Sequence, residues 1–285
     1  MREYHVLNLG AGVQSTALYL LAREGRLSCD VAIFADTGEE PAAVYRHLIW
    51  LFSLGKPPIW VRTAGRLGDD LQQGRNSTGQ RFASIPAFTA TDHRTRAPGK
   101  LRAGRVRRQC TSEYKIEVIE RAIRRDLLVL QPRQRIPRDV IVYQYFGITL
   151  DEAGRAARAK RRFESMAWAK PVYPFLEMGW TRQDCLAWLH QRVPHAVPRS
   201  ACVFCPFHTN SEWAELRRSD PTGWARAVTI DEALRREGNI VNRGLDQKLY
   251  LHRSCVPLTS IDFDALEAEA VDPMTAGECH GMCGV

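Results

Sequence analysis

The chain has 285 residues, 45% of them apolar and 25% charged, and its formal net charge is +8. These values are ordinary for a soluble protein with one large domain, or with one domain and an appendage. They exclude a membrane-spanning class, because no apolar run approaches the ~20 residues that cross a bilayer. The first residues also lack the apolar core and cleavage site of a signal peptide, so we expect a cytoplasmic protein with no membrane partner.

Strand-like and helix-like segments alternate over the first part of the chain. Short apolar runs predict strands at 5–9, 30–35 and 59–62, and amphipathic patterns predict helices at 14–24 and 41–54. This alternation predicts βαβ units, and therefore a parallel sheet with helices on its faces.

The pattern changes after this first part. Residues 66–109 are rich in Gly, Arg, Ser and Thr and have little periodicity, which predicts a long loop that is either functional or mobile. A helix is then expected at 111–127 and a further strand at 140–145. Later residues are typical of helices and loops. We therefore predict a doubly wound parallel α/β domain over 1–172 and a helical, cysteine-containing region over 173–285.

The first candidate site follows the first strand. The segment LGAGVQSTA places small residues between a strand and a helix, so the backbone can approach a phosphate that the helix N-terminus attracts. Ser15 and Thr16 add hydroxyl groups in the first helical turn. A tight strand–helix turn without a ligand is the alternative. The candidate nucleotide-binding residues are Gly10, Ala11, Gly12, Val13, Gln14, Ser15 and Thr16.

A second candidate site follows the second strand, in the segment FADTGEE. Asp36, Thr37 and Gly38 stand at the carboxyl end of that strand, the edge at which open α/β sheets bind ligands. The Asp36 and Thr37 side chains could reach a ribose, an adenine ring or a phosphate-bound Mg²⁺. The alternative is a capped start of the next helix, where acidic residues are favoured. Because both turns belong to one sheet edge, together they predict a nucleotide site more specifically than either alone.

Eight cysteines are many for a cytosolic chain, since a reducing compartment disfavours disulfides. Cys29 and Cys185 lie in strand-like and helical patterns and are expected as small buried side chains. Cys202 and Cys205 form a CxxC turn, which presents two thiolates to one metal centre. Cys110 lies far upstream beside arginines that favour the thiolate. For these last three cysteines an iron–sulfur cluster, a structural zinc ion and thiols without a ligand remain open.

The glycine-rich tail GECHGMCGV contains two further cysteines. Cys279 and Cys283 are candidate catalytic thiols, because a flexible segment near a chain end could swing into an active site. A second pair of metal ligands is the alternative interpretation.

Basic residues are concentrated at 94–108, 121–125 and 155–162. Such clusters form either a solvated surface or a patch that binds phosphates. The phosphates could belong to a nucleotide or to a nucleic acid such as a tRNA or DNA, and charge alone does not separate the two.

The motifs resemble those of the phosphoadenosine phosphosulfate reductase family, within the adenine-nucleotide α-hydrolase superfamily. Residues 12–16 (GVQST) are similar to the superfamily's phosphate loop, and 34–38 (FADTG) to an aspartate–threonine–glycine turn. The segment GITLDEAGR resembles a later glycine-to-arginine motif, which adds Gly147 and Arg155 to the candidate nucleotide site. Gln14 stands where ATP-cleaving members have aspartate, and a neutral amide cannot bind Mg²⁺ as a carboxylate would.

The resemblance also implies a cofactor and a nucleotide. Iron–sulfur members hold a [4Fe–4S] cluster with a double cysteine before a lysine, plus a CxxC pair. Cys110 and Lys115 match that frame, whereas Thr111 replaces the second cysteine. The fourth position would then be open, or be filled by Cys255 or a tail cysteine. The nucleotide would be ATP or phosphoadenylyl sulfate, with Mg²⁺ as a candidate companion.

The family further implies a role for the tail. Phosphosulfate reductases have a glutamate–cysteine–glycine tail whose cysteine attacks sulfur. Here Glu278–Cys279 matches the start of that tail and Cys283–Gly284 matches its end, so neither cysteine is the unambiguous equivalent.

Three functions follow as hypotheses. The first, which we favour, is an adenine-nucleotide-dependent, iron–sulfur-containing enzyme that transfers sulfur to a nucleic acid or a small acceptor, with an electron or sulfur donor protein as partner. The second is a reductase of adenylyl sulfate or phosphoadenylyl sulfate that releases sulfite. The third is a non-catalytic protein that binds metal and nucleic acid and keeps the nucleotide fold as a scaffold.

Overall fold

A five-stranded parallel sheet forms the centre of the protein. The computed structural model describes residues 1–79, 85–90, 103–236 and 248–269. The strand order is β3-β2-β1-β6-β7, and each neighbouring pair is parallel. The strands are β1 (Arg2–Leu9), β2 (Val31–Asp36), β3 (Ile59–Thr63), β6 (Val140–Tyr145) and β7 (Ala169–Val172). Every strand expected from the sequence is present, each within a few residues of its expected bounds.

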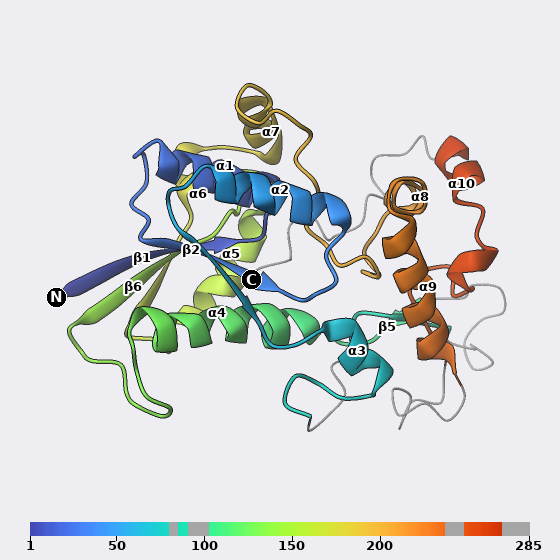
Figure 1. Cartoon of the computed structure of the whole chain (residues 1–285), viewed down its shortest axis with the longest axis horizontal. Helices are drawn as coiled ribbons and strands as arrows, with labels where there is room; N and C mark the ends of the chain where they lie inside the picture. Colours follow the sequence, from blue (N-terminus) through green and yellow to red (C-terminus); the bar gives the residue numbers. More distant parts are fainter. Residues whose placement is uncertain (80–84, 91–102, 237–247, 270–285) are drawn as a thin grey trace.

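Helices cover both faces of this sheet (Figure 1). On one face lie α1 (Val13–Arg23), α2 (Ala42–Ser53), α6 (Pro174–Met178) and α7 (Arg182–His190). On the other face lie α4 (Glu117–Ala122) and α5 (Ala153–Phe163). Side chains of β1 alternate between the faces, since Leu7 packs with α1 while Val6 packs with α4. The predicted doubly wound α/β fold is therefore confirmed.

The helix expected at 111–127 is also present, with an irregular geometry. Its middle is α4, and it is extended at both ends by wider π-helical turns, at Ser112–Ile116 and Ile123–Leu127. Such turns are rare and often occur at functional sites. The first of them begins two residues after Cys110.

A second core lies beside the sheet and combines early and late parts of the chain. Its helices are α3 (Leu67–Gln72), α8 (Asn210–Ser219), α9 (Pro221–Arg235) and α10 (Phe263–Glu269). A small antiparallel sheet accompanies them, with β4 (Phe88–Ala90) between β5 (Ala103–Arg105) and β8 (Leu249–Tyr250). The expectation that 66–109 forms only a loop is therefore wrong, because it contains one helix and two strands of this core.

Two features of the architecture define where ligands would bind. The strand order reverses between β1 and β6, so the turns after these two strands flank the crevice in which open α/β folds bind ligands. Across the described ranges, we find no helix long and apolar enough to cross a membrane.

Candidate functional site

The turn between β1 and α1 is tight and strained. Ala11 has a φ of 56° although it is not glycine, and it is fully buried. A left-handed backbone at a residue with a Cβ costs free energy and recurs at functional sites. The Gly12 N–H donates to Ser15 Oγ at 3.2 Å, and the Thr16 N–H donates to the Gly12 carbonyl at 2.9 Å. The turn thus presents the N-terminus of an eleven-residue helix at the sheet edge, where an anion is favoured.

The two hydroxyl groups of this turn have different surroundings. Thr16 is fully buried, and its Oγ1 lies 2.8 Å from His47 Nε2. His47 Nδ1 in turn lies 2.8 Å from Nε2 of His195, which is exposed. Burial, and to a lesser extent His195, lowers the pKa of His47 to about 4, so this histidine is neutral near pH 7. Thr16 therefore holds the turn through a buried contact with His47, whereas the half-buried Ser15 carries the hydroxyl nearer the surface.

The Gly147 segment lies directly against this turn. A Cβ placed on Gly147 would be 2.9 Å from Gln14 Cβ and 3.1 Å from the Ser15 nitrogen. Only glycine permits this approach without movement of the loop. The predicted nucleotide motifs after β1 and β6 are thus in contact, although about 130 residues separate them in sequence.

A buried carboxylate joins the same two segments. Glu152 accepts hydrogen bonds from Gln14 Nε2 at 3.2 Å, from Thr149 Oγ1 at 3.4 Å and from Arg155 Nη1 at 2.6 Å. Gln14 therefore has a structural partner for its amide, and an aspartate or glutamate there would face a second carboxylate. Arg155, the expected phosphate partner, is buried and forms an ion pair with Glu152.

The turn after β2 connects the carboxyl edge of the sheet to the cysteines. Gly38 has a φ of 72°, and its N–H donates to Asp36 Oδ1 at 2.8 Å. The Tyr45 hydroxyl donates to the same oxygen at 2.9 Å, and burial, followed by Asp36, raises the pKa of Tyr45. Thr37 Oγ1 lies 3.3 Å from Cys202 Sγ. One residue of the predicted nucleotide turn is therefore in contact with the CxxC pair.

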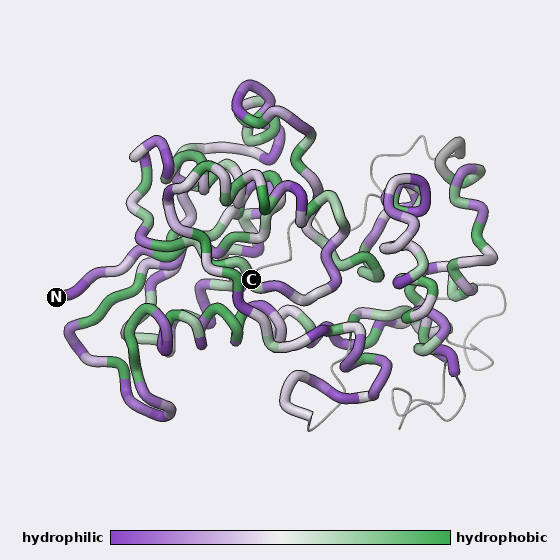
Figure 2. Tube along the Cα trace, in the orientation of Figure 1, coloured by the Kyte–Doolittle hydropathy of each residue, from purple (hydrophilic) through white to green (hydrophobic). Residues whose placement is uncertain are grey.

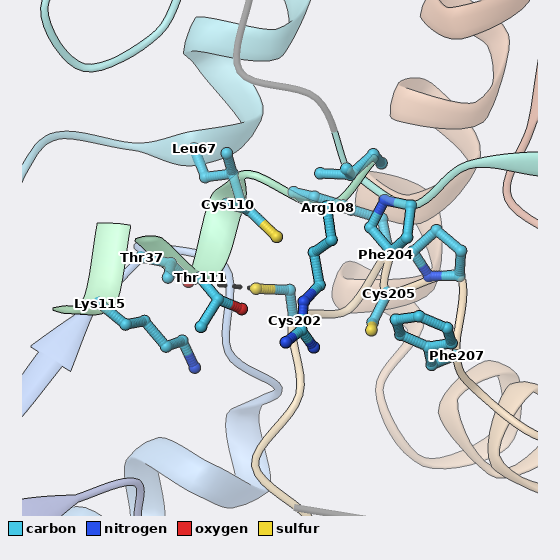
Figure 3. Close-up of a pocket in the computed structure, with 13 residues that line it drawn as sticks. Thr37, Leu67, Arg108, Cys110, Thr111, Lys115, Cys202, Phe204, Cys205 and Phe207 are labelled. Atoms are coloured by element: carbon cyan, nitrogen blue, oxygen red, sulfur yellow. Dashed lines mark hydrogen bonds between the residues drawn. The ribbon is translucent and has the colours of Figure 1, made fainter. Parts of the chain in front are cut away.

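The three candidate metal ligands line one pocket (Figure 3). Cys110 comes from the chain just before the α4 helical stretch, and Cys202 and Cys205 come from the loop before α8. The pocket is small, with a cavity volume of about 40 Å³. We call it the cysteine pocket. Its walls are formed by Thr37, Leu67, Ile85, Pro86, Arg108, Cys110, Thr111, Lys115, Cys202, Phe204, Cys205, Pro206 and Phe207.

The three sulfur atoms do not surround a common point. In Figure 3 the side chains of Cys110 and Cys202 point into the same space, whereas the Cys205 sulfur lies beside Phe207. Consistently, within the described ranges no three His, Cys, Asp or Glu side chains are arranged to hold a metal ion. Cys205 N–H donates to the Cys202 carbonyl at 2.9 Å, so the two belong to one tight turn. A cysteine side chain has a single torsion, and a change of its staggered rotamer relocates the sulfur without backbone movement.

Cationic side chains lie at the same pocket. Arg108 and Lys115 contribute to its walls, and Lys115 Nζ forms a buried ion pair with Glu40 Oε1 at 3.0 Å. Glu40 Oε2 also accepts from Ser200 Oγ at 3.4 Å, two residues before Cys202. Lys115 is thus paired with Glu40, and Arg108 is the second cation of the pocket wall.

The adjacent Glu39 holds the cysteine loop against the sheet edge. Its carbonyl accepts the Val203 N–H at 2.7 Å. Its buried carboxylate accepts from Arg226 on α9 at 2.7 Å and forms an ion pair with Arg66 at 3.1 Å. Arg226 also bonds Asp69 on α3 at 2.5 Å. This set of contacts joins the turn after β2, α3, α9 and the CxxC turn.

The remaining cysteines lie elsewhere. Cys185 is fully buried and Cys29 packs against the same core, as expected, and burial raises the pKa of each to about 12. Cys255 is absent from the residues that line the cysteine pocket and lies in a turn with a φ of 54°. The expected catalytic residues Cys279 and Cys283 lie outside the described residues, so their prediction is untested.

Several residues of the site were missed by sequence reasoning. His47, Glu39, Glu40 and Glu152 are buried polar side chains in ordinary helix or turn contexts, and their partners are distant in sequence. The one available signal was the acidic pair in FADTGEE, which was interpreted as a helix start. Their roles depend on tertiary contacts that no local pattern encodes.

Comparison with known proteins assigns the chain to no family. Protein-family models, curated proteins and solved structures were all searched, and none matches this chain.

Proposed function

We propose that the protein is an adenine-nucleotide-dependent enzyme of sulfur transfer that holds an iron–sulfur cluster on Cys110, Cys202 and Cys205. The observation that carries this proposal is the cysteine pocket, to which two sequence-distant segments bring three thiols beside Thr37 of the nucleotide turn. The resemblance of the motifs to the phosphoadenosine phosphosulfate reductase family supports the same assignment.

The donor set of the pocket fits such a cluster. Iron–sulfur clusters are held by cysteine thiolates, and cations near the sulfurs stabilise the thiolate. Arg108 is such a cation in the pocket wall, whereas Lys115 is paired with Glu40; Phe204 and Phe207 supply apolar walls that limit access of water. Cys205 would have to rotate to join the other two sulfurs. When bound, the cluster would supply iron that binds inorganic sulfur or transfers electrons.

The chain's own residues would bind and activate the nucleotide. Backbone amides of residues 10–16 would hold its phosphates at the N-terminus of α1, in the crevice where the strand order reverses. Transfer of AMP to an acceptor oxygen releases pyrophosphate, and a sulfur nucleophile then displaces AMP. The buried Glu152 cluster would keep Gln14 and the Gly147 segment in place during both steps.

Product analysis tests this proposal. Anaerobically purified protein would be incubated separately with ATP and with adenylyl sulfate, in the presence of Mg²⁺, sulfide and bulk tRNA or DNA as the acceptor. We expect AMP and pyrophosphate from ATP, and loss of this turnover in the Cys202→Ala variant. Sulfite released from adenylyl sulfate would instead identify a reductase. No product from either nucleotide would contradict an enzymatic role.

A further inference from the structure

Two segments of the chain are strongly cationic. Residues 94–108, some of which lie outside the described residues, contain seven Arg or Lys and no Asp or Glu. Residues 121–162, which the structure describes throughout, contain eleven Arg or Lys and four Asp or Glu, a net charge of +7. Ten of the eleven cations are arginine. An ordinary solvated surface has charges of both signs interspersed, whereas positive charge predominates in this segment.

This segment lies on one face of the sheet. It includes the end of the α4 helical stretch, the turn before β6, and all of α5 except its last residue. An ion pair between Arg162 and Glu120 at 2.8 Å joins α5 to α4. Side chains of both helices also line one shallow pocket between them, among them Ile119 and Phe163. The two helices therefore lie side by side on this face of the sheet (Figure 1).

The outer surface of these helices is cationic. We define the basic face by its exposed side chains, which are Arg121, Arg125, Arg158, Lys160 and Arg161. The exposed Arg133, Arg135 and Arg138 lie in the adjoining turn, which is among the most hydrophilic parts of the chain in Figure 2.

Three of the four acidic residues of the segment pair with cations outside the basic face, and the fourth, Asp151, accepts the backbone N–H of Arg182 at 3.1 Å. Asp126 pairs with Arg62 at 2.7 Å and Asp139 pairs with Arg2 at 3.1 Å, and both arginines belong to other segments. Glu152 pairs with the buried Arg155. The positive field of the basic face is thus not cancelled by the acids that accompany it in sequence.

We propose that the basic face binds the sugar–phosphate backbone of a nucleic acid, which is the sulfur acceptor of the proposed enzyme. Arginine is the side chain of choice for phosphate recognition, because its planar fork donates two hydrogen bonds to one phosphate. A lipid surface fits less well, since α5 buries its apolar Ala156, Ala159 and Phe163 against the sheet and presents charge outward. The identification of an acceptor rests on the proposed function; the binding itself does not.

The distance between the basic face and the cysteine pocket suits this role. The α4 helical stretch begins beside Cys110 and carries Arg121 and Arg125 further along. At ~1.5 Å per residue, these arginines lie roughly 16 to 22 Å along the helix from the pocket. A strand that advances ~3.4 Å per nucleotide covers this distance with about five or six nucleotides. The backbone would thus be anchored while a nearby nucleotide reaches the pocket.

Binding of labelled duplexes tests the inference. The probes are a fluorescein-labelled 20-base-pair DNA and an RNA of the same sequence, titrated with full-length protein at salt concentrations from 50 to 200 mM. The variant carries R158E, K160E and R161E. The matched control carries R26E, R46E and K56E, three exposed cations of the same kinds around α1 and α2 on the opposite face. Both variants change the net charge equally.

We expect the α5 variant to bind at least about tenfold more weakly, with the salt slope reduced by about two to three, whereas the control changes affinity less than about threefold. A preference for one probe would identify DNA or RNA as the source of the phosphates. Equal losses in both variants, or polyglutamate bound as tightly as a duplex, would overturn the inference. Iron content and nucleotide binding, measured on the same samples, separate the two proposals. Duplex binding by iron-free protein would leave this inference intact and contradict the proposed function.

Discussion

The partner of Gln14 determines where negative charge lies beside the turn after β1. Its amide donates to the buried Glu152 at 3.2 Å, so the negative charge at this point comes from residue 152 and not from the turn. A resemblance based on sequence reveals that Gln replaces an aspartate. It cannot reveal the reason, because Glu152 is 138 residues away and only the fold brings the two together.

A substitution at this position tests the contact. Gln14→Glu keeps the shape of the side chain but places two carboxylates together in a buried site. We expect the free energy of unfolding to fall by about 1–3 kcal/mol, because a buried hydrogen bond is replaced by repulsion. Urea titration at pH 7 measures this. The same change at the exposed Gln183 should alter stability by less than about 0.5 kcal/mol. A Gln14→Glu protein as stable as the wild type would contradict the contact.

At the scale of elements, the Gly147 segment packs closely against the backbone of the turn after β1. Gly147→Ala would place a methyl group 3.0 Å from the backbone carbon of Gln14, so the turn must shift. We expect adenine-nucleotide affinity to fall at least about tenfold, since amides that hold phosphates depend on sub-ångström placement. Isothermal calorimetry with ATP measures the effect.

Gly154→Ala serves as the matched control for that change. It lies in the same motif, on α5, and its added methyl group would meet nothing within 4 Å. Because alanine favours a helix, stability should rise slightly and affinity should be unchanged. If both variants bound nucleotide equally well, the turn would serve only to connect the strand and helix.

The elements also show which parts of the fold a sequence can predict. Strands β1, β2, β3 and β6 were predicted because each is a short apolar run bounded by turns, whereas β7, at the edge of the sheet, was not. Helices α1, α2 and the α4 stretch were predicted because apolar residues repeat there with helical spacing. Strands β4 and β5 were not predicted, since each is three residues long, and their sheet is completed by β8, which pairs with β4 from far along the chain. Helix α3 is six residues long and packs on α9, so it too depends on a distant partner.

At the scale of the whole molecule, Glu39 joins the nucleotide edge to the second core. Its side chain is 1% exposed and its partners Arg66 and Arg226 come from different segments. We expect Glu39→Gln to lower the free energy of unfolding by about 3–5 kcal/mol, because two cations would lose a buried partner. Thermal unfolding followed by circular dichroism measures the loss.

Glu24→Gln provides the control, because it removes a surface ion pair with Arg192 at 3.0 Å. Exposed pairs contribute about 0–1 kcal/mol, so little change is expected. Similar losses in the two variants would show that Glu39 does not hold the two parts of the molecule together. Sequence reasoning could not identify this residue, since its partners lie up to 187 positions away.

The placement of Cys110, Cys202 and Cys205 in the walls of one pocket could be predicted, because the family resemblance supplied the frame and CxxC supplied the pair. The central claim is that these three thiols hold one iron–sulfur cluster. Iron, sulfide and zinc in anaerobically purified protein test it most directly. We predict iron with matching sulfide in the wild type and in Cys29→Ala, and loss of both as complete in Cys110→Ala as in Cys202→Ala. Full iron in Cys110→Ala, or zinc alone in the wild type, would contradict the account.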